Sequence, residues 1–357
     1  MKVIVYDLIN IYEKEICKNT KNKNKINVFE RNKIQNIFDI KNIIESGNYK
    51  VSRYNIFNIN SPKYRIVMSL NVKDKIINHY ITRNILINKL DKYLDIRNCA
   101  TRKNMGYDYG IKLLLKYLSV FKKYDKFYIL RIDISKYFYN IDHEVLKELL
   151  IDKLEYDEYK IICNVIDSTN EDYVNKEIIK IKERLLNVDK NRYIEIEAIP
   201  LYNYGKGLPI GNMTSQFLSI FYLYKLDHYI VNNLKLKHMI RYMDDYIILS
   251  PTKEYLQYAL KIISEKLENY YQLNINKNKT LITSSNTGFD FLGYRFRFIN
   301  NRLNIWIKSE NKRRKNNNIK KNNYLYRNGL ISYKKYFNSM NNYNNSYKFA
   351  KNKLYYK

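Results

Sequence analysis

Cysteine is scarce in this sequence, and so are long apolar runs. Only Cys17, Cys99 and Cys163 occur in 357 residues, and none has a CxxC spacing. This excludes a disulfide framework or cysteine zinc site and indicates a reducing, cytoplasmic setting. No basic segment leading into an apolar core opens the sequence, so we expect no secretory signal. The most apolar run, residues 217–224, is too short to cross a bilayer, so no membrane partner is expected.

Acidic residues are also few. There are 64 Lys and Arg against 35 Asp and Glu, which gives a net charge of +29. An AT-rich coding sequence explains part of the lysine content, but it would raise glutamate as well. We therefore infer a polyanionic partner, most simply nucleic acid, whose binding weakens with salt. After Asp290 the only acid is Glu310, so the tyrosine-rich C-terminal segment is either a solvated helical lobe or a nucleic-acid track.

Three carboxylates stand out against this basic background. Residues 238–249 form a β-hairpin pattern whose tight turn carries Asp244 and Asp245. Aspartate also favours turns for conformational reasons, so the pair alone is a weak signal. Asp133 ends a β-rich run at residues 128–133, whereas Asp142 is explained as a helix N-cap. If these strands are neighbours in one antiparallel sheet, the three carboxylates form a site for two divalent cations about 4 Å apart, and Mg²⁺ suits such a site.

Cations and glycines recur at other places where they could meet phosphates. A strand pattern over residues 63–68 places Lys63 and Arg65 on one face, where they form either a triphosphate clamp or a solvated face. Arg102 lies in a polar loop. The glycine-punctuated segment 204–212, which includes Gly211, leads into a predicted long helix over residues 213–234. Residues 166–200 carry no motif and predict an excursion with one helix.

Seven blocks then appear in an order that resembles reverse transcriptases, which are RNA-directed DNA polymerases. The resemblance covers roughly residues 50–300. Its blocks are Lys63 with Arg65, the Arg102-Lys103 loop, Asp133 with Phe138, the entry at residues 207–211, the stretch 242–245, the turn at Lys279, and residues 291–294.

The resemblance implies an α+β, right-hand polymerase fold with fingers, palm and thumb. Residues 1–125 would form an N-terminal helical segment and the fingers. Residues 126–300 would form the palm, an antiparallel sheet backed by helices, with an excursion at about 146–205. Residues 301–357 would form a short, basic helical thumb. The implied cofactor is Mg²⁺, as two ions with Mn²⁺ as a substitute, and the implied partners are dNTPs, template RNA and a DNA primer or cDNA.

The resemblance also assigns roles at the reaction centre. Asp133 and Asp244 resemble the principal metal ligands, and Ile134 adjoins them. Asp245 is the neighbouring carboxylate, and because adjacent strand residues point apart, its side chain is expected to point away from that of Asp244. Phe138 occupies the place of an aromatic steric gate against a ribose 2′-hydroxyl, with ordinary palm packing as the alternative.

Further roles concern the nucleotide and the primer. Arg65, with Lys63 beside it, would hold the triphosphate, while Arg102 would either assist or brace the fingers. Tyr242 and Met243 would contact the primer terminus or simply pack on the sheet. Lys279 lies in the turn that would protonate pyrophosphate. The segment Phe291, Leu292, Gly293 and Tyr294 resembles the primer grip, which positions the end of the primer.

Ile210 departs from the common pattern and points to a subtype. Retroviral and group II intron enzymes usually have Gln before the glycine that corresponds to Gly211, and Ser-Pro where this chain has Ser215-Gln216. The stretch 210–216 resembles the reverse transcriptases of diversity-generating retroelements and of related bacterial stand-alone enzymes. Within this stretch, Ile210, Gly211 and Gln216 are expected to bind substrate. An apolar Ile210 cannot hydrogen-bond near the nucleotide, so misincorporation is expected, opposite template adenines by family analogy.

Three functions follow as alternatives. The first is an error-prone reverse transcriptase of a diversity-generating retroelement, encoded by a bacterium, phage or mobile element and assisted by a small basic accessory protein. The second is a bacterial or phage-defence reverse transcriptase with self-primed or untemplated synthesis. The third is a nucleic-acid-binding relative that has lost catalysis. The C-terminal segment has neither the Cys/His cluster of an HNH endonuclease nor the acidic residues of an RNase H domain, so we expect neither activity.

Overall fold

The computed structural model describes residues 2–61, 63–345 and 348–350. Helices surround three separate antiparallel sheets, which confirms the predicted α+β class. Within the described part of the chain, no helix combines the length and apolarity needed to cross a membrane.

The N-terminal third is mostly helical, as its apolar spacing predicts. On α3, Ile37, Ile40 and Ile44 recur at helical spacing and are buried, so this face packs into the core. A two-stranded hairpin separates the first helices from the next ones. The elements are α1 (Val5–Ile11), a π-helical stretch (Tyr12–Cys17), α2 (Lys23–Glu30), α3 (Lys33–Glu45), β1 (Asn55–Ile59), β2 (Arg65–Ser69), α4 (Val72–Tyr80), a second π-helical stretch (Ile81–Ile87), α5 (Asn88–Leu90) and a 3₁₀ turn (Asp91–Tyr93).

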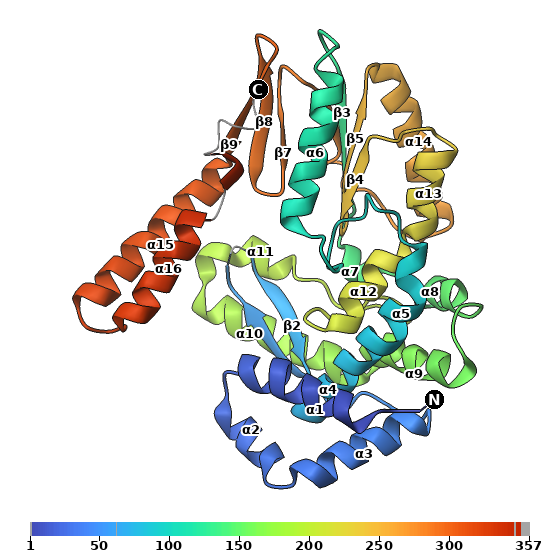
Figure 1. Cartoon of the computed structure of the whole chain (residues 1–357), viewed down its shortest axis with the longest axis vertical. Helices are drawn as coiled ribbons and strands as arrows, with labels where there is room; N and C mark the ends of the chain where they lie inside the picture. Colours follow the sequence, from blue (N-terminus) through green and yellow to red (C-terminus); the bar gives the residue numbers. More distant parts are fainter. Residues whose placement is uncertain (1, 62, 346–347, 351–357) are drawn as a thin grey trace.

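A four-stranded antiparallel sheet forms the centre, in the order β4-β5-β3-β6. Figure 1 shows α6 beside this sheet, with α13 and α14 on its other flank. The elements are α6 (Tyr107–Phe121), β3 (Tyr128–Asp133), α13 (Tyr224–Asn232), β4 (Met239–Tyr242), β5 (Asp245–Ser250), α14 (Lys253–Asn269) and β6 (Leu281–Ser284).

Both faces of β3, β4 and β5 are largely buried, which explains the nearly continuous apolar sequences of these three strands. Successive strand residues point to opposite faces. Ile129 and Ile247 share one core with α6, while Leu130 and Ile248 share another with α14. The alternation therefore fixes the register, because a slip of one residue would exchange the two cores.

Residues 166–200 depart from the prediction of a single helix. After residue 166 there are two helices, α10 and the short α11, together with 3₁₀ turns. The elements are α7 (Tyr137–Asn140), α8 (His143–Leu150), α9 (Tyr156–Ile166), a 3₁₀ turn (Asp167–Asn170), α10 (Asp172–Val188), a 3₁₀ turn (Lys190–Arg192) and α11 (Tyr193–Glu197). Asp142 accepts hydrogen bonds from the backbone N–H groups of Glu144 and Val145, which confirms its predicted N-cap role.

The segment from α10 to α11 packs on the β1–β2 hairpin. The Tyr64 hydroxyl donates to Asp189 at 2.7 Å, and the Tyr64 backbone N–H donates to Glu195 at 2.9 Å. Arg192 donates to the carbonyl of Asn60 at 2.9 Å. The hairpin and this segment therefore form one packed unit, which lies below the central sheet in Figure 1.

Two predicted boundaries are wrong. The helix expected over residues 213–234 is interrupted at Leu223, which separates α12 (Met213–Tyr222) from α13. The predicted palm boundary at residue 300 cuts a hairpin, because β8 pairs with β9 along its whole length. The C-terminal elements are β7 (Phe289–Phe291), β8 (Tyr294–Ile299), β9 (Arg302–Ile307), α15 (Ser309–Arg327), α16 (Tyr333–Asn345) and a 3₁₀ turn (Lys348–Ala350).

The predicted thumb contains a helical hairpin that projects from the molecule. Figure 1 shows α15 and α16 side by side, away from the central sheet. None of the residues of α15 is buried, which accounts for its strongly polar sequence. Residues 346–347 and 351–357 of the predicted thumb lie outside the described residues.

Candidate active site

Two of the three predicted carboxylates face each other across neighbouring strands. Asp133 ends β3 and pairs directly with Asp245, the first residue of β5. Asp244 precedes it in a two-residue turn that joins Tyr242 of β4 to Asp245. The strands expected to be neighbours are thus paired, and all three carboxylates lie at one end of the sheet.

Crowding and burial disfavour negative charge at this end of the sheet. Asp133 is only 6% exposed. Burial raises the pKa of Asp244 to about 6, and the neighbouring carboxylates of Asp245 and Asp133 add to this effect. Burial also raises the pKa of Asp245, although Arg131, 3.3 Å away, opposes it. A cation would relieve this repulsion.

Lys279 supplies one such cation. Its Nζ lies 3.0 and 3.1 Å from the two carboxylate oxygens of Asp133. The next residue, Thr280, helps to keep Lys279 close to Asp133, because its hydroxyl accepts a hydrogen bond from the Asp133 N–H at 3.3 Å. The lysine predicted to protonate pyrophosphate therefore lies in contact with Asp133, one of the three clustered carboxylates.

The donor set fits Mg²⁺, although the protein does not enclose an ion by itself. Among the described residues, no group of three His, Cys, Asp or Glu side chains is arranged to hold a metal. Mg²⁺ does not require one, because it binds one or two carboxylates and completes its octahedron with water and substrate phosphates. Asp133, Asp244 and Asp245 offer only oxygen ligands, as Mg²⁺ prefers. The side chain of Ile134 is a hydrocarbon without a donor atom, so only its backbone carbonyl could serve as a ligand.

A cavity of about 490 Å³ opens beside Asp244. Residues from the β1–β2 hairpin, α7, the glycine loop, α12 and the β4–β5 turn meet there. Tyr64, Ile199 and Pro200 complete part of the wall. The predicted substrate residues that line the cavity are Arg65, Phe138, Ile210, Gly211, Gln216 and Met243.

The positions of the two predicted triphosphate cations differ. Arg65 is exposed at the start of β2 and lines the cavity. Among the described residues its guanidinium makes no hydrogen bond or ion pair, so it is available to a ligand. Lys63 precedes the strand, is exposed and does not line the cavity. The geometry favours Arg65.

The glycine-punctuated segment 204–212, called the glycine loop, forms backbone hydrogen bonds with two walls of the cavity. The N–H of Leu208 donates to the carbonyl of Phe138 at 2.7 Å, and the Met68 N–H donates to the Ile210 carbonyl at 2.9 Å. Gly211 has φ +111°, and a Cβ there would lie 2.8 Å from a methyl of Val67. Glycine is therefore required where the loop meets β2.

Arg102 is placed as a brace, which corrects its assignment as a substrate-binding residue. Its guanidinium contacts the carboxylate of Asp91 and the carbonyls of Asp91, Asp95 and Asn98, at 2.7–3.4 Å. All five N–H donors thus have acceptors, and the side chain is only 7% exposed. Of the two roles left open by the sequence, the contacts favour bracing.

The predicted primer-grip residues separate into core and turn. Phe291 and Tyr294 are buried and pair across β7 and β8. Leu292 and Gly293 form the two-residue turn between them, both with positive φ. Of these four residues, only Leu292 and Gly293 are not fully buried. Tyr242, half-buried, does not line the cavity, so the geometry favours packing for this residue.

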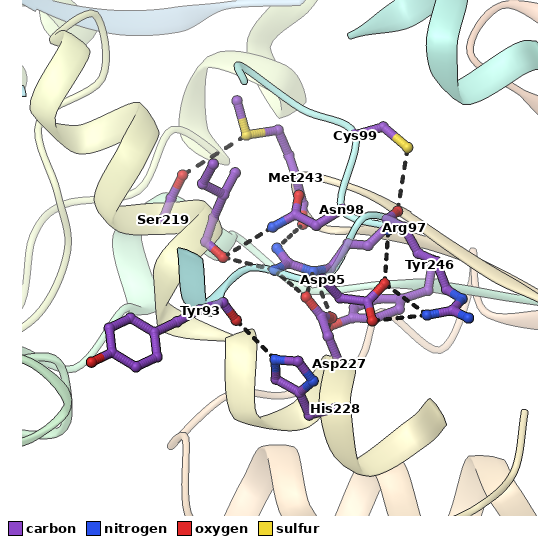
Figure 2. Close-up of polar contacts among 12 residues, drawn as sticks. Tyr93, Asp95, Arg97, Asn98, Cys99, Ser219, Asp227, His228, Met243 and Tyr246 are labelled. Carbon is purple, nitrogen blue, oxygen red and sulfur yellow. Dashed lines mark hydrogen bonds and ion pairs between the residues drawn. The ribbon is translucent and has the colours of Figure 1, made fainter. Parts of the chain in front are cut away.

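Sequence reasoning missed one pair of residues beneath the site. Arg241 and Asp227 are both 0% exposed and form an ion pair of 2.6 Å. A signal exists for Arg241, which follows Met239 and Ile240 in a predicted strand, and charged residues are rarely buried unless they are paired. Figure 2 shows Asp227 among the polar groups near Met243 and Tyr246.

Taken together, the central sheet with acidic strand ends, the β1–β2 hairpin and the projecting helical hairpin form the predicted right-hand polymerase fold. The family model for reverse transcriptase (RNA-dependent DNA polymerase) matches residues 57–296, which is well over half of the chain. The chain belongs to the reverse transcriptase family. No curated protein matches it in sequence.

Solved structures of yeast telomerases are similar to it at low identity. Apo telomerase from Candida tropicalis has a TM-score of 0.47 and 15% identity, over 70% of this chain and 47% of that one. A form of it truncated from the C-terminal domain has a TM-score of 0.49 and 14% identity, over 77% of this chain and 60% of that one. Telomerase from Candida albicans, in complex with a fragment of telomeric RNA, has 0.46 and 14%, over 73% and 47%. The chain thus spans about half the length of these proteins.

Proposed function

We propose that this chain synthesises DNA on an RNA template by nucleotidyl transfer to a primer. The observation that carries the proposal is the pairing of Asp133 with Asp245 at the strand ends, with Asp244 on the wall of the cavity. Bound Mg²⁺, as two ions replaceable by Mn²⁺, would activate the primer hydroxyl and neutralise the departing pyrophosphate. Template RNA, a DNA primer or cDNA and dNTPs are the corresponding partners.

The residues of the cavity have distinct tasks in this proposal. Arg65, whose guanidinium makes no hydrogen bond or ion pair among the described residues, holds the triphosphate. Phe138 fills the space that a 2′-hydroxyl needs. Lys279, already beside Asp133, places a cation where the pyrophosphate forms. The fingers then include the β1–β2 hairpin, the palm the central sheet, and the thumb α15 and α16.

Primer extension on an RNA template tests this proposal. Asp133→Asn and Asp244→Asn are each expected to lower the rate by about 10²-fold or more, since a metal site supplies several kcal/mol to the transition state. Asp125→Asn is the matched control, because Asp125 is exposed and lies outside the cavity. Equal extension by wild type and Asp244→Asn would refute the catalytic proposal and leave a nucleic-acid-binding role.

We further propose error-prone synthesis of the kind that diversifies a target gene, with a small basic accessory protein as partner. Ile210 supports this, because its half-buried side chain offers the cavity only apolar contact. Ile210→Gln is expected to reduce misincorporation opposite template adenines, measured by sequencing the cDNA. Ile199→Gln, in the same cavity, controls for adding an amide. An error spectrum that Ile210→Gln leaves unchanged would remove this residue from the explanation.

A further inference from the structure

The strand that leads to the catalytic turn contains a completely buried arginine. Arg241 lies between Ile240 and Tyr242 of β4 and is 0% exposed. Its Nε donates to both carboxylate oxygens of Asp227, at 2.8 and 3.0 Å, and its Nη2 donates to one of them at 2.6 Å. The hydroxyl of Tyr246 donates to the same carboxylate at 3.0 Å. The carboxylate of Asp227 on α13 therefore fixes the orientation of the Arg241 guanidinium.

The other donors of Arg241 reach two backbone carbonyls. Nη2 donates to the carbonyl of Ile220 on α12 at 2.7 Å, and Nη1 donates to the carbonyl of Met243 at 3.0 Å. The Met243 carbonyl belongs to the peptide group that joins Met243 to Asp244. A side chain anchored in two helices thus holds the peptide that immediately precedes a predicted metal ligand.

The conformation of this peptide needs support. Met243 has φ +59°, in the left-handed region that side chains other than glycine rarely adopt. Its sulfur also lies 3.8 Å from the hydroxyl of Ser219, a contact that Figure 2 shows. The turn is therefore held at its backbone by Arg241 and at its side chain by α12.

An ion pair is a poor choice if the only purpose is to stabilise a core. The free-energy cost of removing two charges from water offsets most of their Coulomb attraction, and well-packed apolar residues often stabilise a core as much. The planar fork of arginine, however, directs several donors at fixed angles. Two of the acceptors of Arg241 are backbone carbonyls, and one of these is in the catalytic turn. The contacts are what a positioning role requires.

We propose that Arg241, held by Asp227, is a positioning residue that fixes the Met243–Asp244 peptide and so directs the Asp244 carboxylate toward Asp133 and Asp245. This proposal rests on the proposed function, in which Asp244 is a metal ligand. Neither residue contacts the substrate cavity, so the effect on the reaction is transmitted through the turn.

Arg241→Lys tests the positioning role. Lysine keeps a positive charge beside Asp227, so the fold is retained, but its single ammonium cannot reach the same set of acceptors. The expected result is a 10- to 100-fold fall in kcat, about the effect of a misplacement near 1 Å, with the KM for dNTP within about twofold. Arg97→Lys is the matched control, because Arg97 forms an ion pair of 2.8 Å with Asp95 and contacts no turn residue. It should keep kcat within about twofold.

Two further measurements separate positioning from simple stabilisation. Glycine adopts positive φ without strain, so the fall in kcat caused by Arg241→Lys should shrink to about threefold or less when Met243→Gly is present. Without substrates, the rise in Tm on adding Mg²⁺ should be smaller for Arg241→Lys than for wild type, and absent for Asp244→Asn.

The outcomes are distinct. A fall in kcat that Met243→Gly does not reduce, with an unchanged Mg²⁺-induced rise in Tm, would show that Arg241 only stabilises the core and would overturn the positioning role. A wild-type protein that extends no primer would refute the proposed function instead. In that case the Mg²⁺-induced rise in Tm still tests whether Arg241 directs Asp244.

Discussion

Replacing Asp244 with asparagine should stabilise the metal-free protein while abolishing its activity. Burial and two neighbouring carboxylates raise the pKa of Asp244 from 3.8 to about 6. Between these values the folded state binds more protons than the unfolded state. The ionised group therefore opposes folding, most strongly above about pH 6. A difference of 6 − 3.8 = 2.2 in pKa corresponds to about 3 kcal/mol at about pH 7.5, as an upper estimate.

Urea unfolding with a chelator present measures this effect. Near pH 7.5, Asp244→Asn should unfold at higher urea than wild type, by about 3 kcal/mol or less in unfolding free energy. Near pH 5 the advantage should fall to about half, because wild-type Asp244 is then largely protonated when folded. The exposed Asp125→Asn variant should show neither change. A less stable Asp244→Asn, or an advantage that does not shrink toward pH 5, would refute the electrostatic argument.

Three other substitutions test the cavity and its supports. Phe138→Val should raise ribonucleotide incorporation about tenfold or more relative to dNTP, measured by single-nucleotide extension, and unchanged discrimination would exclude a gate role. Arg65→Gln should raise the KM for dNTP about tenfold at unchanged Tm, whereas Arg102→Gln should lower Tm and leave that KM alone; the opposite pattern would reverse the two roles. Gly211→Ala should impair both Tm and extension, because its Cβ would meet Val67 at 2.8 Å, and a wild-type Tm would contradict this.

The carboxylates could be predicted because antiparallel strands impose simple geometry. A strand that ends on an acid and a hairpin that turns on two acids must meet at one sheet end if they are neighbours. The observed pairing of Asp133 with Asp245 has this form. The apolar runs around them were long enough to identify the strands without ambiguity.

The partners of individual side chains were less accessible to sequence reasoning. Arg102 lies in a basic loop that resembles a phosphate contact, yet carbonyls and a carboxylate from residues 91–98 take up all its donors. Phe291 and Tyr294 match a motif, but strand pairing turns both rings into the core. Asp227 follows an apolar run, and its spacing in the sequence does not reveal that Arg241 is its partner. In each case tertiary packing decides which groups meet.

The unit formed by the β1–β2 hairpin and the α10–α11 segment also restricts how the cavity can change shape. Tyr64 and Arg65 enter the cavity from the hairpin, while Ile199 and Pro200 enter it from the far end of the segment. Hydrogen bonds through Asp189 and Glu195 couple the two, so neither wall moves without the other. In the proposed function, closure over a nucleotide would move the hairpin and the segment together, so a segment without sequence motifs helps to set the width of the cavity.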